Sequence, residues 1–258
     1  MTTLKIATWN LNSLNVRLPH LLKWLDKHRP DFIGLQELKM QHDNFPVDIF
    51  NKEGYDCYWM GQKTFNGVAI LSRHSILSTH NVLPELNEEQ KRAISIETNH
   101  GYFINLYCPN GREKGSASFE YKMMWYAQLS QYLREIIKTQ KMCIVCGDFN
   151  IAPAEVDIYD HTRFEDTILC TPEEKSCFQD IINIGFIDVF REMNPKERQY
   201  SWWDYRGGSF RQNKGARIDH ILIDNEHNNC VTGCYIDTEP RKEDRPSDHT
   251  PVIMEISI

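Results

Sequence analysis

The first forty residues predict a strand, a helix and a second strand in succession. Residues 4–8 alternate in polarity as a half-buried strand does, and residues 14–28 carry leucines at helical spacing before Pro30. Residues 31–36 are mostly apolar and predict a buried strand. A strand–helix–strand beginning predicts an α/β protein, in which helices cover the faces of a sheet.

Predicted strands and helices also follow one another along the rest of the chain, which contains no repeat or linker-like segment. Its 258 residues are enough to bury a sizeable core, and we expect a single domain over residues 1–258. The connections are long, and long loops in a compact domain commonly carry function. We expect further strands at residues 68–71, 93–97, 102–107, 142–146, 217–223 and 252–258, and helices at residues 116–138 and 172–184.

The eight cysteines predict free thiols rather than disulfides or a zinc site. The chain begins without a secretory signal, so we expect a soluble, cytoplasmic protein with no membrane attachment. Cys143 and Cys146 have zinc-like spacing, but they lie in a predicted strand, where residues three apart point to opposite faces. We therefore interpret both as structural.

Polar or ionisable residues stand at the ends of most predicted strands. An aspartate after a glycine is usually a turn residue, and a lone glutamate is usually the point where a strand meets water. The strands of an α/β sheet, however, can bring their ends to one crevice, where such sheets bind ligands. We expect the following side chains to gather there: Asn10, Glu37, Tyr107, Asp148, Asn150, Asp219, Asp248 and His249.

This set of side chains predicts a divalent cation and hydrolysis of a phosphate ester. Carboxylate and amide oxygens suit Mg²⁺ or Mn²⁺, and several carboxylates in one cleft repel each other unless a cation is bound. Asp219 can orient His249, while amides and a phenol can stabilise charge on phosphoryl oxygens. The sequence contains neither a P-loop nor a Gly-x-Gly-x-x-Gly after a strand.

Seven sequence blocks resemble the exonuclease III family of the endonuclease/exonuclease/phosphatase superfamily, in order and across nearly the whole chain. The Gln-Glu, Gly-Asp-x-Asn and Ser-Asp-His blocks specify only the superfamily. The Trp-Asp-Tyr-Arg and Tyr-x-Pro-Asn-Gly blocks specify its DNA-repair branch. The blocks are TWNLNSL (8–14), LQELK (35–39), YCPNG (107–111), GDFNIAP (147–153), SWWDYR (201–206), RIDH (217–220) and RPSDH (245–249).

The resemblance implies an α/β fold of the four-layered sandwich type, in which two packed mixed β-sheets are flanked by helices. It implies Mg²⁺-dependent cleavage of DNA phosphodiesters, with Mn²⁺ able to substitute. The implied activities are 3′→5′ exonuclease action on duplex DNA, removal of 3′ blocking groups, and incision at abasic sites in base excision repair. We also expect a monomer without an obligate protein partner, acting at the nucleoid of a bacterial-type cell.

The resemblance assigns roles to individual residues. Glu37 is the expected metal ligand, and Asp148 is expected to activate water or assist the leaving group. Asp219 is expected to orient His249, which binds the scissile phosphate. The implied metal site comprises Asn10, Glu37, Asp148, Asn150, Asp248 and His249, and the implied phosphate contacts include Tyr107 and Asn150.

A basic and aromatic stretch predicts the DNA-binding face. The net charge of the chain is −7, but residues 196–217 hold six basic and two acidic side chains. Trp202 and Trp203 could belong to the core, yet their polar neighbours favour a surface loop that stacks on a terminal or damaged nucleotide. The expected DNA contacts are Arg17, Lys39, Asn110, Leu169, Trp202, Trp203, Arg206 and Arg217.

Leu169 is a departure from the family pattern. Repair endonucleases tend to carry a small residue where Leu169 aligns, beside the pocket for an extruded sugar. A bulky side chain there could crowd an abasic deoxyribose while leaving a 3′ terminus accessible. We therefore expect 3′-end processing to exceed abasic-site incision.

Two other functions remain open at this point. The same fold could act on an inositol phosphate or a phospholipid headgroup, although the tryptophan-rich basic loop argues against it. The chain could also be a binding module without activity, although every matched site residue is present. Because the charge is acidic overall, we expect modest, salt-sensitive DNA binding that a divalent cation strengthens.

Overall fold

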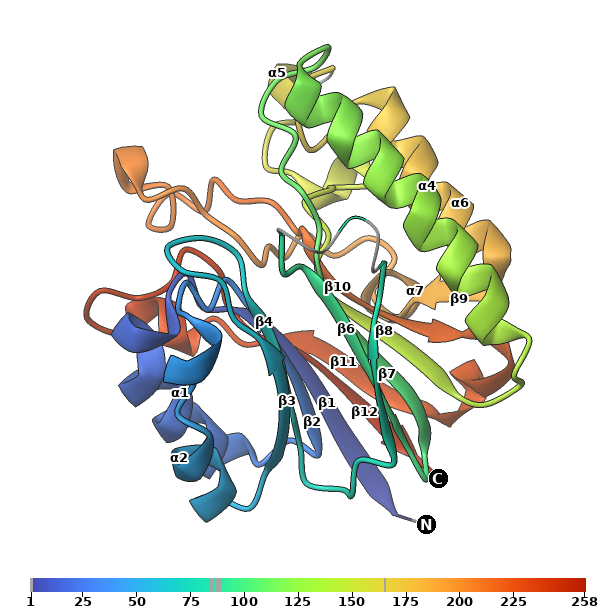
Figure 1. Ribbon diagram of the computed structural model, residues 1–258. Coiled ribbons are helices and arrows are strands. Elements are labelled where there is room, and N and C mark those ends of the chain that lie inside the picture. The colour runs from blue at the N-terminus through green and yellow to red at the C-terminus, as the bar shows by residue number, and fades with distance from the viewer. Residues whose placement is uncertain (1, 84–85, 87–89, 165) are drawn as a thin grey trace.

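Two six-stranded β-sheets pack face to face, with helices on the outer face of each (Figure 1). The computed structural model describes residues 2–83, 86, 90–164 and 166–258. The strand orders are β11-β12-β1-β2-β4-β3 and β5-β6-β7-β8-β10-β9. Both sheets combine parallel and antiparallel pairs, so the predicted four-layered sandwich is confirmed.

The strands of both sheets are short, and most of their central residues are buried. The first sheet contains β1 (Thr3–Asn10), β2 (Phe32–Gln36), β3 (Asp56–Met60), β4 (Val68–Ser72), β11 (Val231–Ile236) and β12 (Val252–Ser257). The second contains β5 (Ser78–Asn81), β6 (Ala93–Thr98), β7 (Gly101–Tyr107), β8 (Cys143–Asp148), β9 (Phe186–Asp188) and β10 (Asp219–Asp224).

The helices complete the outer layers. α1 (Leu14–His28) and α2 (Val47–Lys52) cover the first sheet, while α4 (Ala117–Ile137) and α6 (Pro172–Gly185) lie side by side on the second (Figure 1). α6 begins with a capping box, in which Thr171 and Glu174 satisfy each other's backbone amides. Two short helices lie in the connections, α5 (His161–Phe164) and α7 (Val189–Met193).

Three apolar layers follow from this arrangement: one between the sheets and one beneath each pair of helices. Cys146 lies in the layer between the sheets and Cys143 in the layer under α4. The two side chains therefore point to opposite faces of β8, as predicted. All eight cysteines fall within the described residues, and all are free thiols.

The strands that the sequence did not predict are β3, β5, β9 and β11. Each is the edge strand of its sheet. The conformation of an edge strand depends more on pairing with its one neighbour than on the apolar pattern of its own sequence. β5 (STHN), for example, is largely polar and exposed. A strand was also predicted to begin at Arg217, whereas β10 begins at Asp219.

The site-bearing strand ends lie at one edge of the sandwich. β1 and β2 are parallel, as are β7 and β8, with Tyr107 opposite Asp148. β10 runs antiparallel to β8 and starts with Asp219 opposite Asp148. Between the sheets, Gln36 donates to the Asn105 side-chain oxygen at 2.6 Å, and this buried contact links the two sheets. Among the described residues, no helix is long and apolar enough to cross a bilayer.

Candidate active site

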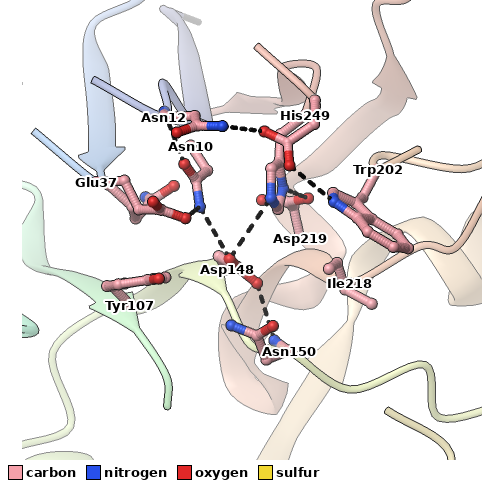
Figure 2. Close-up of polar contacts among 12 residues, drawn as sticks. Asn10, Asn12, Glu37, Tyr107, Asp148, Asn150, Trp202, Ile218, Asp219 and His249 are labelled. Carbon is pink, nitrogen blue, oxygen red and sulfur yellow. Dashed lines mark hydrogen bonds and ion pairs between the residues drawn. The ribbon is translucent and has the colours of Figure 1, made fainter. Parts of the chain in front are cut away.

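Asp148 lies at the centre of the polar cluster that these strand ends form (Figure 2). It is 1% exposed. The Asn10 side-chain amide donates to Asp148 Oδ2 and to Glu37 Oε1, both at 2.9 Å. The backbone amide of Asn150 donates to Asp148 Oδ1 at 2.9 Å. The carboxylate is therefore held from β1 and from its own loop, which fixes its orientation.

His249 faces Asp148 from the other side of the cluster (Figure 2). Its Nδ1 lies 2.8 Å from Asp219 Oδ2, and its Nε2 lies 3.8 Å from Asp148 Oδ2. Ser201 donates to the same Asp219 oxygen at 2.6 Å. Asp219 thus orients the His249 ring and directs its Nε2 into the site.

The pKa values of this pair depart from their ordinary range. Burial raises the pKa of Asp148 to about 7, against the opposing effect of His249. Burial alone would lower the pKa of His249, but Asp219 and Asp148 raise it to about 10. The histidine is therefore a cation at neutral pH, and the aspartate can take up a proton close to neutral pH.

Three of the predicted residues have the geometry of a cation site. One ligand atom each from Glu37, Asp148 and His249 lies within 4.8 Å of the others. Carboxylate oxygens match the preference of Mg²⁺ and Mn²⁺, and a bound cation would offset the repulsion from Asp219 and Glu37 that adds to burial in raising the pKa of Asp148. Lys39 Nζ lies 2.6 Å from Glu37 Oε2 and supplies part of the positive charge that offsets this carboxylate. The Glu37 and Asp148 carboxylates fit a divalent cation, whereas His249 in its protonated form has no lone pair to offer one.

Asp248 was predicted as a metal residue, but its carboxylate is already engaged by two side chains. Asn12 donates to Oδ1 at 2.9 Å, and the Trp202 indole donates to Oδ2 at 3.1 Å. Asp248 is also not part of the cation-compatible group among the described residues. Asp248 therefore links Trp202 to Asn12 at the edge of the polar cluster.

The predicted phosphate contacts lie together on the β7 and β8 loops. The Asn150 side-chain amide donates to the Cys108 carbonyl at 2.9 Å, and Asn110 donates to Asn150 Oδ1 at 3.1 Å. Tyr107 points toward Glu37, and burial together with that carboxylate raises its pKa well above the ordinary value. The Tyr107 phenol therefore remains protonated and can donate a hydrogen bond.

Three residues that support this site were not predicted from the sequence. Asn12 holds Asp248, Ser201 holds Asp219, and the Arg92 guanidinium lies 4.6 Å above the Tyr107 ring. Asn12 and Ser201 lie inside sequence blocks that were noted, so their position next to a site residue was the available signal. Arg92 lies outside every block.

Some predicted DNA contacts lie on the accessible surface near the site. The Arg206 side chain is 93% exposed and Asn110 is exposed. Lys39 lies beside Glu37. Arg17 is half-buried and donates to Tyr205 and to the Pro246 carbonyl, so it joins two loops at the rim.

The prediction that Arg217 contacts DNA is wrong. Arg217 is completely buried and forms two-pronged ion pairs with Asp157 and Asp188. It had been assigned to the basic loop because it follows that loop directly. The chain has already entered the interior at Ala216, which pairs with Trp202.

The prediction that Trp203 stacks on DNA is also wrong. Trp203 is 2% exposed and packs against Tyr200 and Phe210, whereas Trp202 remains half-buried at the site. Neighbouring side chains point in opposite directions here, so only one of the two is accessible. Leu169, which is 5% exposed, belongs to an apolar cluster on which Trp202 packs.

The endonuclease/exonuclease/phosphatase family model matches residues 7–249. The chain belongs to this family. It is 35% identical to the exodeoxyribonuclease III of Haemophilus influenzae, over 98% of this chain and 99% of the relative. It is 30% identical to an exodeoxyribonuclease of Bacillus subtilis, over 99% of this chain and the whole relative.

Solved structures of similar proteins superpose over almost the whole chain. The 3′ phosphatase NExo from Neisseria, solved as a single-residue variant bound to a product DNA hairpin, is 40% identical, with a TM-score of 0.96. The match covers 99% of this chain and all of the Neisseria chain. An AP endonuclease from Archaeoglobus fulgidus is 32% identical, with a TM-score of 0.94 and the same coverage. The family and fold that the sequence blocks predicted are confirmed.

Proposed function

We propose that this chain hydrolyses phosphodiesters and phosphomonoesters at the 3′ ends of duplex DNA, with Mg²⁺ as its cation and Mn²⁺ able to substitute. The class of activity follows from the family: the chain is a metal-dependent hydrolytic nuclease of the exodeoxyribonuclease III type, which acts in DNA repair with 3′-end processing. The arrangement around Asp148, between the Asn10–Glu37 side and the Asp219–His249 side, carries the proposal.

The proposed mechanism assigns the removal of a proton from the attacking water to one of this chain's own residues. Asp148 accepts a proton from water as the water oxygen attacks phosphorus, because its carboxylate lies at the centre of the site and is oriented there by Asn10 and Asn150. The bond between phosphorus and the 3′ oxygen breaks, that oxygen takes up a proton from solvent water, and Asp148 returns its proton to solvent. Glu37, with Asp148 and Asn10 beside it, would hold the divalent cation, which would offset negative charge on the phosphate.

The remaining site residues hold the phosphate as its charge redistributes. His249 is positive at neutral pH and presents Nε2 to the site, so it donates a charge-assisted hydrogen bond to a phosphoryl oxygen. The Asn150 amide and the Tyr107 phenol are further donors on the opposite side. Asp219 keeps His249 charged and correctly oriented throughout.

A groove beside the site supports a nucleic acid substrate over a phosphoinositide. It has a volume of about 550 Å³ and extends from Glu37 and Tyr107 to the β3–β4 loop. Its wall carries Lys39, Arg92 and Arg112, together with Phe65, which is 65% exposed. Basic side chains next to an exposed aromatic ring suit a phosphate backbone with adjoining sugars and bases.

We further propose that abasic-site incision is weaker than 3′-end processing. Trp202 is held by Asp248 on one side and packs on the Leu169 cluster on the other. Leu169 is a bulky member of that cluster, and we infer that its volume narrows the space for an extruded deoxyribose. We also propose one catalytic domain over residues 1–258, acting as a cytoplasmic monomer at the nucleoid without an obligate protein partner.

A comparison of four substrates tests the proposed function. The purified protein is given a duplex with a 3′-phosphate, a duplex with a 3′-hydroxyl, a duplex with one internal tetrahydrofuran, and a phosphoinositide, each with Mg²⁺ and with EDTA. We expect rapid, Mg²⁺-dependent hydrolysis of the first two, slower incision of the third and none of the fourth. Incision of the tetrahydrofuran duplex as fast as 3′ digestion would refute the role of Leu169, as would an unchanged ratio in Leu169→Gly. Phosphoinositide hydrolysis without DNA hydrolysis would refute the DNA substrate.

A further inference from the structure

A fully buried lysine, Lys122 of α4, lies beneath the catalytic loops and has no role in the mechanism above. Its ammonium donates to the Asn150 carbonyl at 2.7 Å and to the Asn110 carbonyl at 3.2 Å, and it is paired with the Glu174 carboxylate. Burying an ammonium is unfavourable unless its donors have partners, and here all three acceptors converge on it. Two of them belong to the backbone of proposed phosphate contacts.

Glu174 extends this connection to the far end of the loop that follows Asn150. Its Oε1 is paired with Lys122, and its Oε2 accepts from the Thr171 backbone amide at 3.0 Å and hydroxyl at 2.8 Å. The loop of residues 151–170 therefore has both ends attached to one buried ion pair. This loop carries Leu169, on whose cluster Trp202 packs.

Tyr126, one helical turn after Lys122, adds a second attachment. Its buried hydroxyl donates to the Phe149 carbonyl, next to the carbonyl that Lys122 binds. Asn150 has a φ of 50°, in the left-handed region that residues other than glycine seldom occupy. This conformation lets its backbone amide reach Asp148 while its side chain reaches the β7 loop. The α4 contacts to residues 149 and 150 hold the backbone in that conformation.

We propose that Lys122, Tyr126 and Glu174 are positioning residues for the nuclease. Through the carbonyls of residues 110, 149 and 150 they fix the Asn150 amide at the scissile phosphate and the expected DNA contact Asn110 beside it. Through Thr171 they fix the loop that carries Leu169. The inference rests on the proposed function, because it takes Asn110 and Asn150 as phosphate contacts. Its consequence is that residues on the covering helices control turnover and substrate preference without touching DNA.

Two variants that disturb the packing to different degrees test this role, and a third variant is the control. Tyr126→Phe removes one hydroxyl and leaves the packing intact. Lys122→Met combined with Glu174→Gln removes both charges together, so that neither remains buried without a partner. Glu173→Gln is the matched control, because Glu173 lies beside Glu174 in the first turn of α6 but outside the site. Its carboxylate forms an exposed ion pair with Lys114 at 3.0 Å.

The readouts are kcat and KM on a 3′-phosphate DNA hairpin, the ratio of 3′-phosphate hydrolysis to tetrahydrofuran incision, and the melting temperature. We expect kcat to fall on the order of 10-fold in Tyr126→Phe and 100-fold in the double variant. A catalytic group misplaced by about 1 Å costs roughly 100-fold in rate, and Tyr126→Phe removes only one of the contacts that hold the loop. KM should stay within about twofold, since the basic groove residues Lys39, Arg92 and Arg112 are not altered, and the substrate ratio should shift in the double variant only. Glu173→Gln should match the wild type in every readout.

The outcomes separate this inference from the proposed function. A folded Tyr126→Phe and a folded double variant with wild-type kcat and substrate ratio would refute the positioning role. If the double variant does not fold, an unchanged kcat in folded Tyr126→Phe is sufficient to refute the positioning role. A wild-type protein that hydrolyses no DNA would instead overturn the proposed function, whatever the variants do.

Discussion

Two clusters of buried charge use the same kinds of side chain for different purposes. At Arg217, the guanidinium meets Asp157 and Asp188 in paired hydrogen bonds of 2.6 to 3.0 Å. Burial would raise the pKa of both aspartates, but Arg217 outweighs it and lowers the pKa of each. At Asp148, burial outweighs the partners, and the pKa rises to about 7.

The difference lies in how completely each charge is compensated. Asp157 and Asp188 share a permanent cation with fork-like geometry, so they remain ionised and take part in structure. Asp148 has an amide from Asn10 and a histidine whose Nε2 is 3.8 Å away. One oxygen of Asp219 has no hydrogen-bond partner among the described residues. Incomplete compensation leaves the second cluster able to exchange protons and to bind a cation, which is what catalysis requires.

The largest expected effect comes from Asp148→Asn. We expect DNA hydrolysis to fall by about 10³-fold or more, since the proposed general base is lost and the cation site is weakened. DNA binding should persist, and thermal stability in EDTA should stay equal or rise, because an incompletely compensated buried charge is gone. Steady-state kinetics, a binding titration and a melting curve test this. Near-normal turnover would contradict the assigned role.

Arg217→Met should lower the stability of the fold and leave the catalytic site intact, the opposite of Asp148→Asn. We expect it to lower the free energy of unfolding by about 3–5 kcal/mol, because it leaves two buried carboxylates without their cation. Urea unfolding measures this, and any folded fraction should retain cation-dependent hydrolysis. Arg206→Met, which alters a 93% exposed side chain, is the control and should change stability by less than about 0.5 kcal/mol. Equal stability of the two variants would mean that the buried network is not structural.

Asp219→Asn should fall between these extremes. The carboxylate that raises the pKa of His249 is lost, so His249 should release its proton at a lower pH. We expect kcat at neutral pH to fall by about 10- to 100-fold, with the alkaline limit of activity displaced to lower pH. A pH profile of kcat measures both effects. An unchanged alkaline limit would mean that His249 does not depend on Asp219.

The smallest expected effect concerns stability against pH in EDTA. A carboxyl group whose folded pKa lies above its unfolded value binds more protons when folded, so its contribution to stability declines as pH rises between the two values. For Asp148 that window runs from its ordinary value near 4 to about 7. Asp157 and Asp188 have lowered pKa values, so their contribution is present above about pH 4 and is lost only in acid. Asp148→Asn should flatten the first decline without changing acid unfolding, which urea titrations at several pH values would show.

The two clusters also differ in how far sequence reasoning reached them. The Asp148 cluster was predicted because its members stand at strand ends inside recognisable blocks. The Arg217 network was misjudged because Asp157 and Asp188 lie 60 and 29 residues from Arg217, and nothing local indicates that they meet it. Lys122 and Glu174 escaped for the same reason, since each looks like an ordinary charged residue of an amphipathic helix.

The sequence by itself determined the family, the order of most strands and helices, and the residues that meet at the catalytic edge. These follow from local periodicity and from side chains whose chemistry is needed at fixed points along the chain. Only the tertiary structure decided which charges are buried, which partner each has, and that Trp202 but not Trp203 faces the site. Burial and pairing depend on contacts between distant segments, and they decide whether a charged or aromatic side chain serves the interior or the substrate.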